Sequence, residues 1–122
     1  MSTLLIVEDE PNIGQFIMVN LQARGFDVQY APNAEEGLVL LQTFKPEALI
    51  LDIKLPGMSG WEMLKAIDTD PVLSKIPVII MTASSIFSQP DEYRYSNIIE
   101  KLIKPVSVTD LLRAVRVIFP IR

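Results

Sequence analysis

Five ionisable or hydroxyl side chains stand directly after short apolar runs of the chain. Glu8 and Asp9 follow "LLIV", Asp52 follows "ALIL", Thr82 follows "VIIM" and Lys104 follows "KLI". If each run is a strand of one parallel sheet, these side chains meet at one edge, where such sheets bind ligands. Three carboxylates within ~5 Å of one another would repel by about 3 kcal/mol per pair at an effective dielectric constant of about 20. We therefore expect a cation among them.

The expected site would suit phosphoryl transfer. A single lysine does not neutralise three carboxylates, and an all-oxygen donor set with few ligands favours Mg²⁺ over an all-protein Ca²⁺ cage. A free carboxylate in such a site can attack phosphorus and become an aspartyl phosphate. The metal, the lysine and the hydroxyl would stabilise the charge on the transferring oxygens.

Each of these residues also has a purely structural interpretation. The acids after the first run could complement the positive end of a following helix. Asp52 could begin a turn, Thr82 could simply end a strand, and for Lys104 alone a solvated surface lysine is the stronger interpretation. Together, however, these interpretations leave the gathered negative charge unexplained. The joint pattern favours a functional site.

Composition excludes several classes of function. The chain has 122 residues, with neither cysteine nor histidine, which is enough for one domain with a hydrophobic core. The absence of cysteine and histidine excludes disulfides, thiol nucleophiles, histidine general bases and Cys or His metal sites. The net charge of −4 disfavours direct nucleic-acid binding. No apolar run approaches the ~20 residues of a membrane span, and nothing resembles a signal peptide.

Short β-rich runs alternate with helical patterns along the chain. The predicted strands are Thr3–Val7, Phe26–Tyr30, Ala48–Leu51, Val78–Met81 and Lys101–Ile103. Strands that alternate with helices imply an α/β fold, with one parallel sheet covered by helices on both faces. The nearly continuous apolar strands agree, because both faces of such a sheet are buried.

The helices have recognisable start and stop signals. Pro11 suits a first helical position, Ile13, Phe16, Ile17 and Leu21 recur at helical spacing, and Gly25 ends this helix. Three further starts resemble capping boxes: Asn33 with Glu36, Ser59 with Glu62, and Ser107 with Asp110. The apolar residues predicted to face inward from them are Leu38, Leu41, Leu64, Ile67, Leu111 and Val115. Residues 84–97 are polar and contain Pro90, which predicts at best a short helix.

Four motifs are specific in combination: "VEDE" after the first strand, "LDIKLPGMSG" around Asp52, "MTA" at the end of the fourth strand and "KP" after the fifth. In this order and at these separations, they make the chain resemble the receiver domain of two-component response regulators, in a single-domain, chemotaxis-regulator-like form. The resemblance covers essentially all of residues 1–122. It implies a flavodoxin-like, doubly wound five-stranded parallel sheet of order 2-1-3-4-5 with five helices.

The resemblance also implies the metal and phosphoryl chemistry of the site. Asp52 would be the phosphoacceptor. Asp9 and Asp52 would bind Mg²⁺ directly, with the backbone carbonyl of Lys54, and Glu8 would act largely through water.

Further residues would contact the phosphoryl group or form the switch region. Thr82 and Lys104 would contact the phosphoryl oxygens, and Ala83 would keep the entrance small. The peptide bond between Lys104 and Pro105 would be cis. Many receivers carry an aromatic residue where this chain has Lys101, and burying an unpaired ammonium costs several kcal/mol. We therefore expect Lys101 to point outward, with phosphorylation relayed through residues 84–89 and the short helix.

As a receiver, the protein would be a cytoplasmic signalling switch and not an enzyme, with at most slow self-phosphorylation and autodephosphorylation. A histidine kinase or phosphotransfer protein would donate the phosphoryl group. An output protein would bind the face formed by a short helix at Pro90–Asn97, the strand Lys101–Ile103 and the helix after Ser107. We expect a monomer or weak dimer, with no direct nucleic-acid or membrane binding.

Two other function classes stay open. One is a docking domain that keeps the fold without being phosphorylated, which the complete site disfavours and Lys101 favours. The other is a phosphatase of the haloacid dehalogenase type. Such enzymes place a second acid two residues after the nucleophile, where this chain has Lys54. Flavin binding is set aside, because the loop after the first strand is anionic and offers no phosphate cradle.

Overall fold

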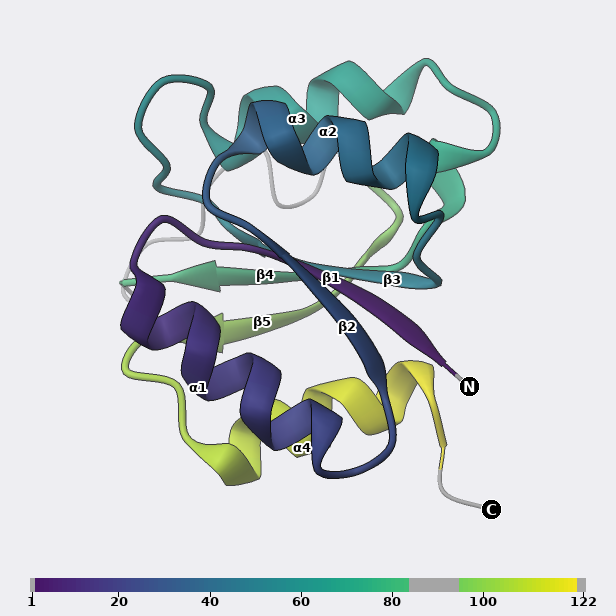
Figure 1. Ribbon diagram of the computed structural model, residues 1–122. Coiled ribbons are helices and arrows are strands. Elements are labelled where there is room, and N and C mark those ends of the chain that lie inside the picture. The colour runs from purple at the N-terminus through teal and green to yellow at the C-terminus, as the bar shows by residue number, and fades with distance from the viewer. Residues whose placement is uncertain (1, 84–94, 121–122) are drawn as a thin grey trace.

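The computed structural model describes residues 2–83 and 95–120, and its strands form one parallel sheet of order β2-β1-β3-β4-β5 (Figure 1). The strands are β1 Thr3–Val7, β2 Asp27–Ala31, β3 Ala48–Asp52, β4 Val78–Thr82 and β5 Ile98–Ile103. The predicted fold class and strand order are therefore confirmed.

Helices cover both faces of the sheet, with α2 and α3 on one side and α1 and α4 on the other (Figure 1). Their bounds are α1 Pro11–Gln22, α2 Ala34–Thr43, α3 Gly60–Asp68 and α4 Val108–Ile118, with a 3-10 turn η1 at Leu73–Lys75. The described residues hold four α-helices against five predicted, and α4 is the helix predicted after Ser107. The predicted short helix at Pro90–Asn97 lies mostly in residues 84–94, outside the described part of the chain. None of the described helices is long and apolar enough to cross a membrane.

Two apolar clusters sandwich the sheet, because successive strand residues point to opposite faces. On β1, Leu5 and Val7 belong to the cluster beneath α2 and α3, whereas Leu4 and Ile6 belong to the cluster beneath α1 and α4. The same alternation continues in β3 and β4. Each strand therefore contributes to both halves of the core.

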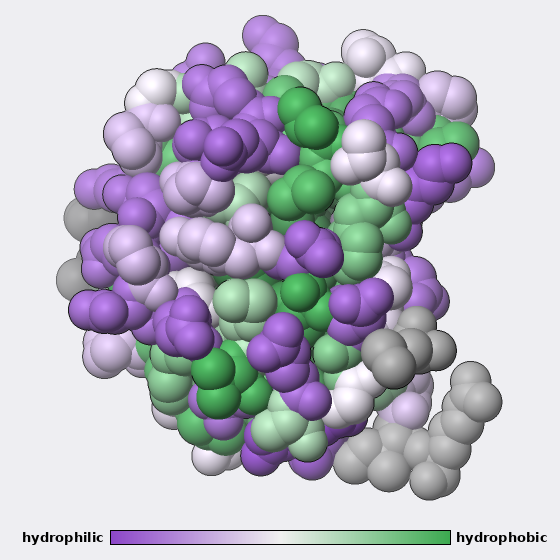
Figure 2. Space-filling model, in the orientation of Figure 1, coloured by the Kyte–Doolittle hydropathy of each residue, from purple (hydrophilic) through white to green (hydrophobic). Residues whose placement is uncertain are grey.

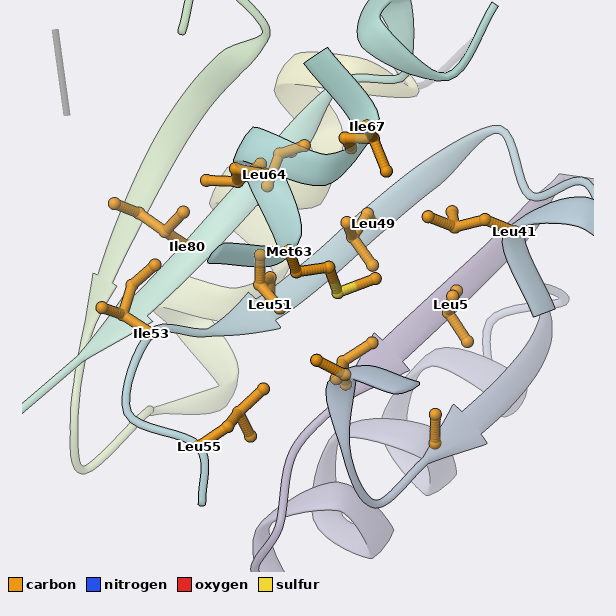
Figure 3. Close-up of a cluster of buried hydrophobic side chains, with 14 of the residues drawn as sticks. Leu5, Leu41, Leu49, Leu51, Ile53, Leu55, Met63, Leu64, Ile67 and Ile80 are labelled. Carbon is orange, nitrogen blue, oxygen red and sulfur yellow. The ribbon is translucent and has the colours of Figure 1, made fainter. Parts of the chain in front are cut away.

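The cluster beneath α2 and α3 fixes α3 against the central strand. Met63, Leu64 and Ile67 of α3 are buried over Leu49 and Leu51 of β3 (Figure 3). Fully burying a side chain of this size stabilises the fold by about 1.5–3 kcal/mol. This packing holds the start of α3 beside the end of β3, where Asp52 lies.

The helix starts follow the predicted signals to different degrees. At α3 the capping box is complete: Ser59 Oγ accepts from the Glu62 amide at 3.2 Å, and Glu62 accepts from the Ser59 amide at 3.3 Å. Asn33 and Ser107 cap α2 and α4 through their own side chains. These caps satisfy amides that have no partner within the helix.

Several predicted features differ from the structure, and β3 and β4 each extend one residue further than predicted. β5 begins at Ile98, three residues before the predicted Lys101, because its ladder with β4 starts where Val78 pairs with Ile98. β2 is displaced by one residue, since its register pairs Thr3 with Asp27. Phe16 is 37% exposed, because the buried stripe of α1 runs through other positions.

Phe16 belongs to a group of large apolar residues exposed on several elements. In the orientation of Figure 1, apolar residues gather in a band down the middle of this face, with hydrophilic residues on both sides (Figure 2). Val19 of α1 and Val39 of α2 are also exposed. Apolar atoms contribute roughly half or more of the surface of a folded protein, so this band alone does not indicate a binding site.

Candidate functional site

The sheet register brings the predicted site residues to one edge. Val7, the last residue of β1, pairs with Leu51 of β3, so Glu8 and Asp52 occupy neighbouring strand ends. Thr82 pairs with Ile103, and Lys104 follows directly. Because side chains alternate, Glu8, Asp52 and Lys104 lie on the face covered by α1 and α4.

Lys104 joins the two buried carboxylates across 96 and 52 positions of the chain. Its Nζ lies 2.9 Å from Glu8 Oε1, 3.3 Å from Glu8 Oε2 and 2.9 Å from Asp52 Oδ2. The side chain of Glu8 is 0% exposed and that of Asp52 3%. One ammonium therefore serves two carboxylates that have almost no access to solvent.

The backbone around Asp52 fixes its second oxygen. Asp52 Oδ1 accepts a hydrogen bond from the Lys54 amide at 3.0 Å. The Ile53 amide donates to the Met81 carbonyl at 3.1 Å, which ties the residue after Asp52 to β4. A Cβ at Gly60 would lie 2.6 Å from the Asp52 carbonyl oxygen, so only glycine lets α3 begin this close to the strand end.

A third carboxylate completes an all-oxygen cluster. Glu8, Asp9 and Asp52 each offer an oxygen, and these oxygens all lie within 4.8 Å of one another. Glu8 and Asp52 are buried, and Asp9 is half-buried at the mouth. Carboxylate oxygens with one side open to water are the environment that Mg²⁺ prefers, because it keeps several waters. The residues present therefore fit a magnesium ion.

Burial and neighbouring charge shift the pKa values of Glu8 and Lys104. Burial, followed by the neighbouring Asp52 carboxylate, raises the pKa of Glu8 to about 8, although Lys104 acts in the opposite direction. Burial lowers the pKa of Lys104, but its hydrogen bonds and charge contacts with Glu8 and Asp52 outweigh this, and the net shift is upward. Lys104 therefore stays cationic, while the metal-free site favours a proton on Glu8.

The remaining predicted site residues lie around this centre. Thr82 is half-buried at the end of β4, and its carbonyl accepts from the Lys104 amide at 2.8 Å. Ala83 is exposed beyond it. The Lys104–Pro105 peptide bond is cis, which confirms that prediction. Lys101 is half-buried on β5, paired with Ile80, and its outward direction stays a prediction.

Three supporting groups were missed from the sequence. The Lys54 amide and the close approach of Gly60 both act on Asp52. The Tyr30 hydroxyl donates to the backbone carbonyl of Glu8 at 2.5 Å. Gly60, a glycine at the start of the predicted helix, could have indicated the close approach to Asp52. Nothing in the local sequence indicates the hydrogen bonds of the Lys54 amide or the Tyr30 hydroxyl.

The site thus combines three acids and a lysine at the carboxyl edge of a doubly wound parallel sheet. Comparison with known proteins identifies the protein family that has this arrangement. The family sequence model for the response regulator receiver domain matches residues 4–116, so the chain belongs to that family. It is accordingly a receiver domain of a two-component response regulator.

Relatives of two lengths are similar to the chain. The DNA-binding dual master transcriptional regulator RpaA of Synechocystis is 30% identical over 95% of this chain, which spans only 48% of that relative. Protein PilH of Pseudomonas aeruginosa is 29% identical, over 97% of this chain and 98% of its own. The crystal structure of response regulator TrrA from Thermotoga maritima superposes with a TM-score of 0.84, at 29% identity, over 97% of this chain and 99% of its own.

Proposed function

We propose that the protein is a phosphorylation-dependent switch whose phosphoacceptor is Asp52. The observation that carries this proposal is the position of its carboxylate: buried at the edge of the sheet, held by Lys104 on one oxygen and by the Lys54 amide on the other. A merely structural aspartate would not need two further acids beside it. The donor would be a phosphohistidine of a histidine kinase or phosphotransfer protein.

In the proposed reaction, an Asp52 carboxylate oxygen attacks the phosphorus atom as the bond between phosphorus and the donor imidazole nitrogen breaks. The electron pair of that bond leaves with the imidazole, and Asp52 becomes an acyl phosphate. Lys104 already lies 2.9 Å from Asp52, where its charge can stabilise the transferring oxygens. The Thr82 hydroxyl at the end of the neighbouring strand would donate to the same group, and Ala83 would keep the entrance small.

Mg²⁺ would be held by Asp9 and Asp52 with the Lys54 backbone carbonyl, and by Glu8 through water. When bound, the ion neutralises negative charge on the carboxylates and on the incoming phosphoryl oxygens. TrrA, which is similar over nearly its whole length, forms a complex with Mg²⁺–BeF, and this supports the same ligand chemistry here. Glu8, pulled toward Lys104, would also position that lysine.

The output would be a change in partner binding, not turnover of a substrate. Self-phosphorylation and loss of the phosphoryl group would at most be slow. A partner would bind the face that includes β5 and α4, and the relay through residues 84–89 lies outside the described part of the chain. Cytoplasmic location and a monomeric or weakly dimeric state stay predictions.

Incubation with acetyl phosphate and Mg²⁺, followed by intact-mass measurement, tests this function. The wild type should gain one phosphoryl group, and Asp52→Asn should gain none. Glu100→Gln removes a carboxylate from β5, away from the site, and serves as the matched control that should react normally. An adduct that survives Asp52→Asn, or that forms equally well in EDTA, would contradict the proposal.

A further inference from the structure

The end of β2 holds the backbone of Glu8 from both sides. The Glu8 amide donates to the Ala31 carbonyl at 3.1 Å, and the Glu8 carbonyl accepts from the Tyr30 hydroxyl at 2.5 Å. Ala31 and Tyr30 are consecutive, so one short piece of β2 satisfies both polar groups of this residue. These two hydrogen bonds therefore fix the backbone of Glu8, the first residue of the turn that follows β1.

A glycine on α1 makes room for the tyrosine ring. A Cβ built at Gly14 would lie 2.3 Å from Tyr30 Cε1 and 2.8 Å from Cδ1. Glycine is a poor residue for a helix interior, so its presence at the fourth position of α1 needs a packing reason. The Tyr30 ring supplies that reason, because it occupies the space that a side chain at position 14 would need. There α1 lies beside β2 (Figure 1).

The Glu8 carbonyl belongs to the peptide group that joins Glu8 to Asp9. Fixing this peptide plane fixes the direction in which the Asp9 backbone leaves the strand, and therefore where its carboxylate starts. Glu8 is already held at its side chain by Lys104. Among the described residues, no hydrogen bond to the Asp9 side chain appears, so its placement depends on the backbone before it.

We propose that Tyr30 is a positioning residue for the metal site: its hydroxyl, seated by Gly14, aligns the Glu8–Asp9 peptide so that the Asp9 carboxylate is placed to bind Mg²⁺. This role deepens the proposed function and rests on it. Tyr30 itself does not contact the metal or the phosphoryl group. It acts on Asp9 through the backbone of Glu8.

The test is Mg²⁺ affinity without any phosphodonor, measured from amide chemical shifts during a titration. Tyr30→Phe keeps the ring and removes the hydroxyl, and it should weaken Mg²⁺ binding by about fivefold, the effect of one ordinary hydrogen bond. Thr43→Val is the matched control. It deletes a hydroxyl that donates to the Val39 carbonyl at 3.1 Å on the exposed end of α2, and it should leave the affinity unchanged.

A second pair of variants separates positioning from general stability. Gly14→Ala should displace the intact tyrosine and weaken Mg²⁺ binding, as Tyr30→Phe does. In a Tyr30→Ala background the ring is gone, so Gly14→Ala should no longer affect the affinity and should stabilise α1, because alanine is a better helix former. This background keeps the test informative if Gly14→Ala alone fails to fold.

Wild-type protein that binds Mg²⁺, together with a Tyr30→Phe variant that binds it equally well, would overturn the positioning role and leave the proposed function intact. Additive effects of Gly14→Ala and Tyr30→Ala would also overturn that role. Wild-type protein that binds no Mg²⁺ would overturn both proposals together.

Discussion

The two faces of the sheet use the same strands for different purposes. On β3, Leu51 points into the cluster beneath α2 and α3, whose buried members carry no charge. The next residue, Asp52, points to the face beneath α1 and α4, where the apolar cluster ends in Glu8, Asp52 and Lys104. Adjacent residues of one strand thus belong to a packing surface and to the charged site.

The two faces affect the stability of the fold in opposite directions. Burial of leucine and isoleucine side chains stabilises the fold in proportion to the apolar area removed from water. Two buried carboxylates that share one ammonium do the opposite, because desolvation of charge is only partly offset by pairing. The charged end of the sheet is therefore best explained by function.

Leu51→Ala should give the largest change in stability. Leu51 is 0% exposed, and truncation of such a leucine typically destabilises a protein by about 2–5 kcal/mol. Urea denaturation in EDTA measures this. Leu51→Met, which keeps the volume, is the control and should lose much less. If the alanine variant unfolds at the wild-type midpoint, the apolar face does not carry the stability.

Asp9→Ala should instead act on metal binding. Removing a proposed direct ligand should weaken Mg²⁺ affinity by roughly tenfold or more, because loss of a second-shell partner alone already costs about that much. Unfolding in EDTA should change little, because Asp9 is only half-buried. Glu10→Ala, at the exposed neighbouring position, is the matched control and should bind Mg²⁺ normally. Equal affinities of Asp9→Ala and the wild type would remove Asp9 from the metal site.

The metal-free protein should be more stable at pH 5 than at pH 8. The pKa of Glu8 is about 8 in the fold against its ordinary 4.5, so the folded state binds this proton more tightly than the unfolded chain does. The resulting stabilisation is full below pH 4.5 and is lost as the pH rises through about 8. Thermal unfolding in EDTA at several pH values measures it, and Glu8→Gln should flatten the curve. A wild-type curve already flat between these values would contradict the shift.

Ser59→Ala should have the smallest effect. It removes the N-cap of α3 and should cost about 1 kcal/mol of unfolding free energy, because the Glu62 amide loses its partner. Mg²⁺ affinity should change little, since the packing of α3 on β3 remains. Ser59→Asp, which can also cap, should restore the stability seen in urea denaturation. A loss of Mg²⁺ binding as large as that of Asp9→Ala would show that the cap is part of the site.

Much of the fold could be predicted because local patterns and global arrangement agree. β1, β3 and β4 are continuous apolar runs, so their positions were found to within one residue. The start of β5 was missed, because Glu100 interrupts its apolar pattern even though its backbone pairs with β4. The exposure of Phe16 was missed because helical spacing alone does not say where the apolar stripe ends.

The convergence of the site residues was also predictable, since parallel strands end at a common edge. The pairing within that edge was not. Which carboxylates Lys104 contacts depends on register and rotamers across 96 positions of chain. The contact of Tyr30 with the Glu8 carbonyl depends on a glycine of α1, and no short-range pattern joins the two.

The most direct test of the account compares thermal unfolding of the wild type and Asp52→Asn, each in EDTA and in saturating Mg²⁺. A ligand that binds only the folded state raises the midpoint. We predict that Asp52→Asn unfolds in EDTA at or above the wild-type midpoint, because it removes one of the crowded negative charges. We also predict that Mg²⁺ raises the midpoint of the wild type but not that of the variant. A variant that is much less stable in EDTA, or that gains as much from Mg²⁺ as the wild type, would contradict the claim that Asp52 is placed there for metal and phosphoryl chemistry.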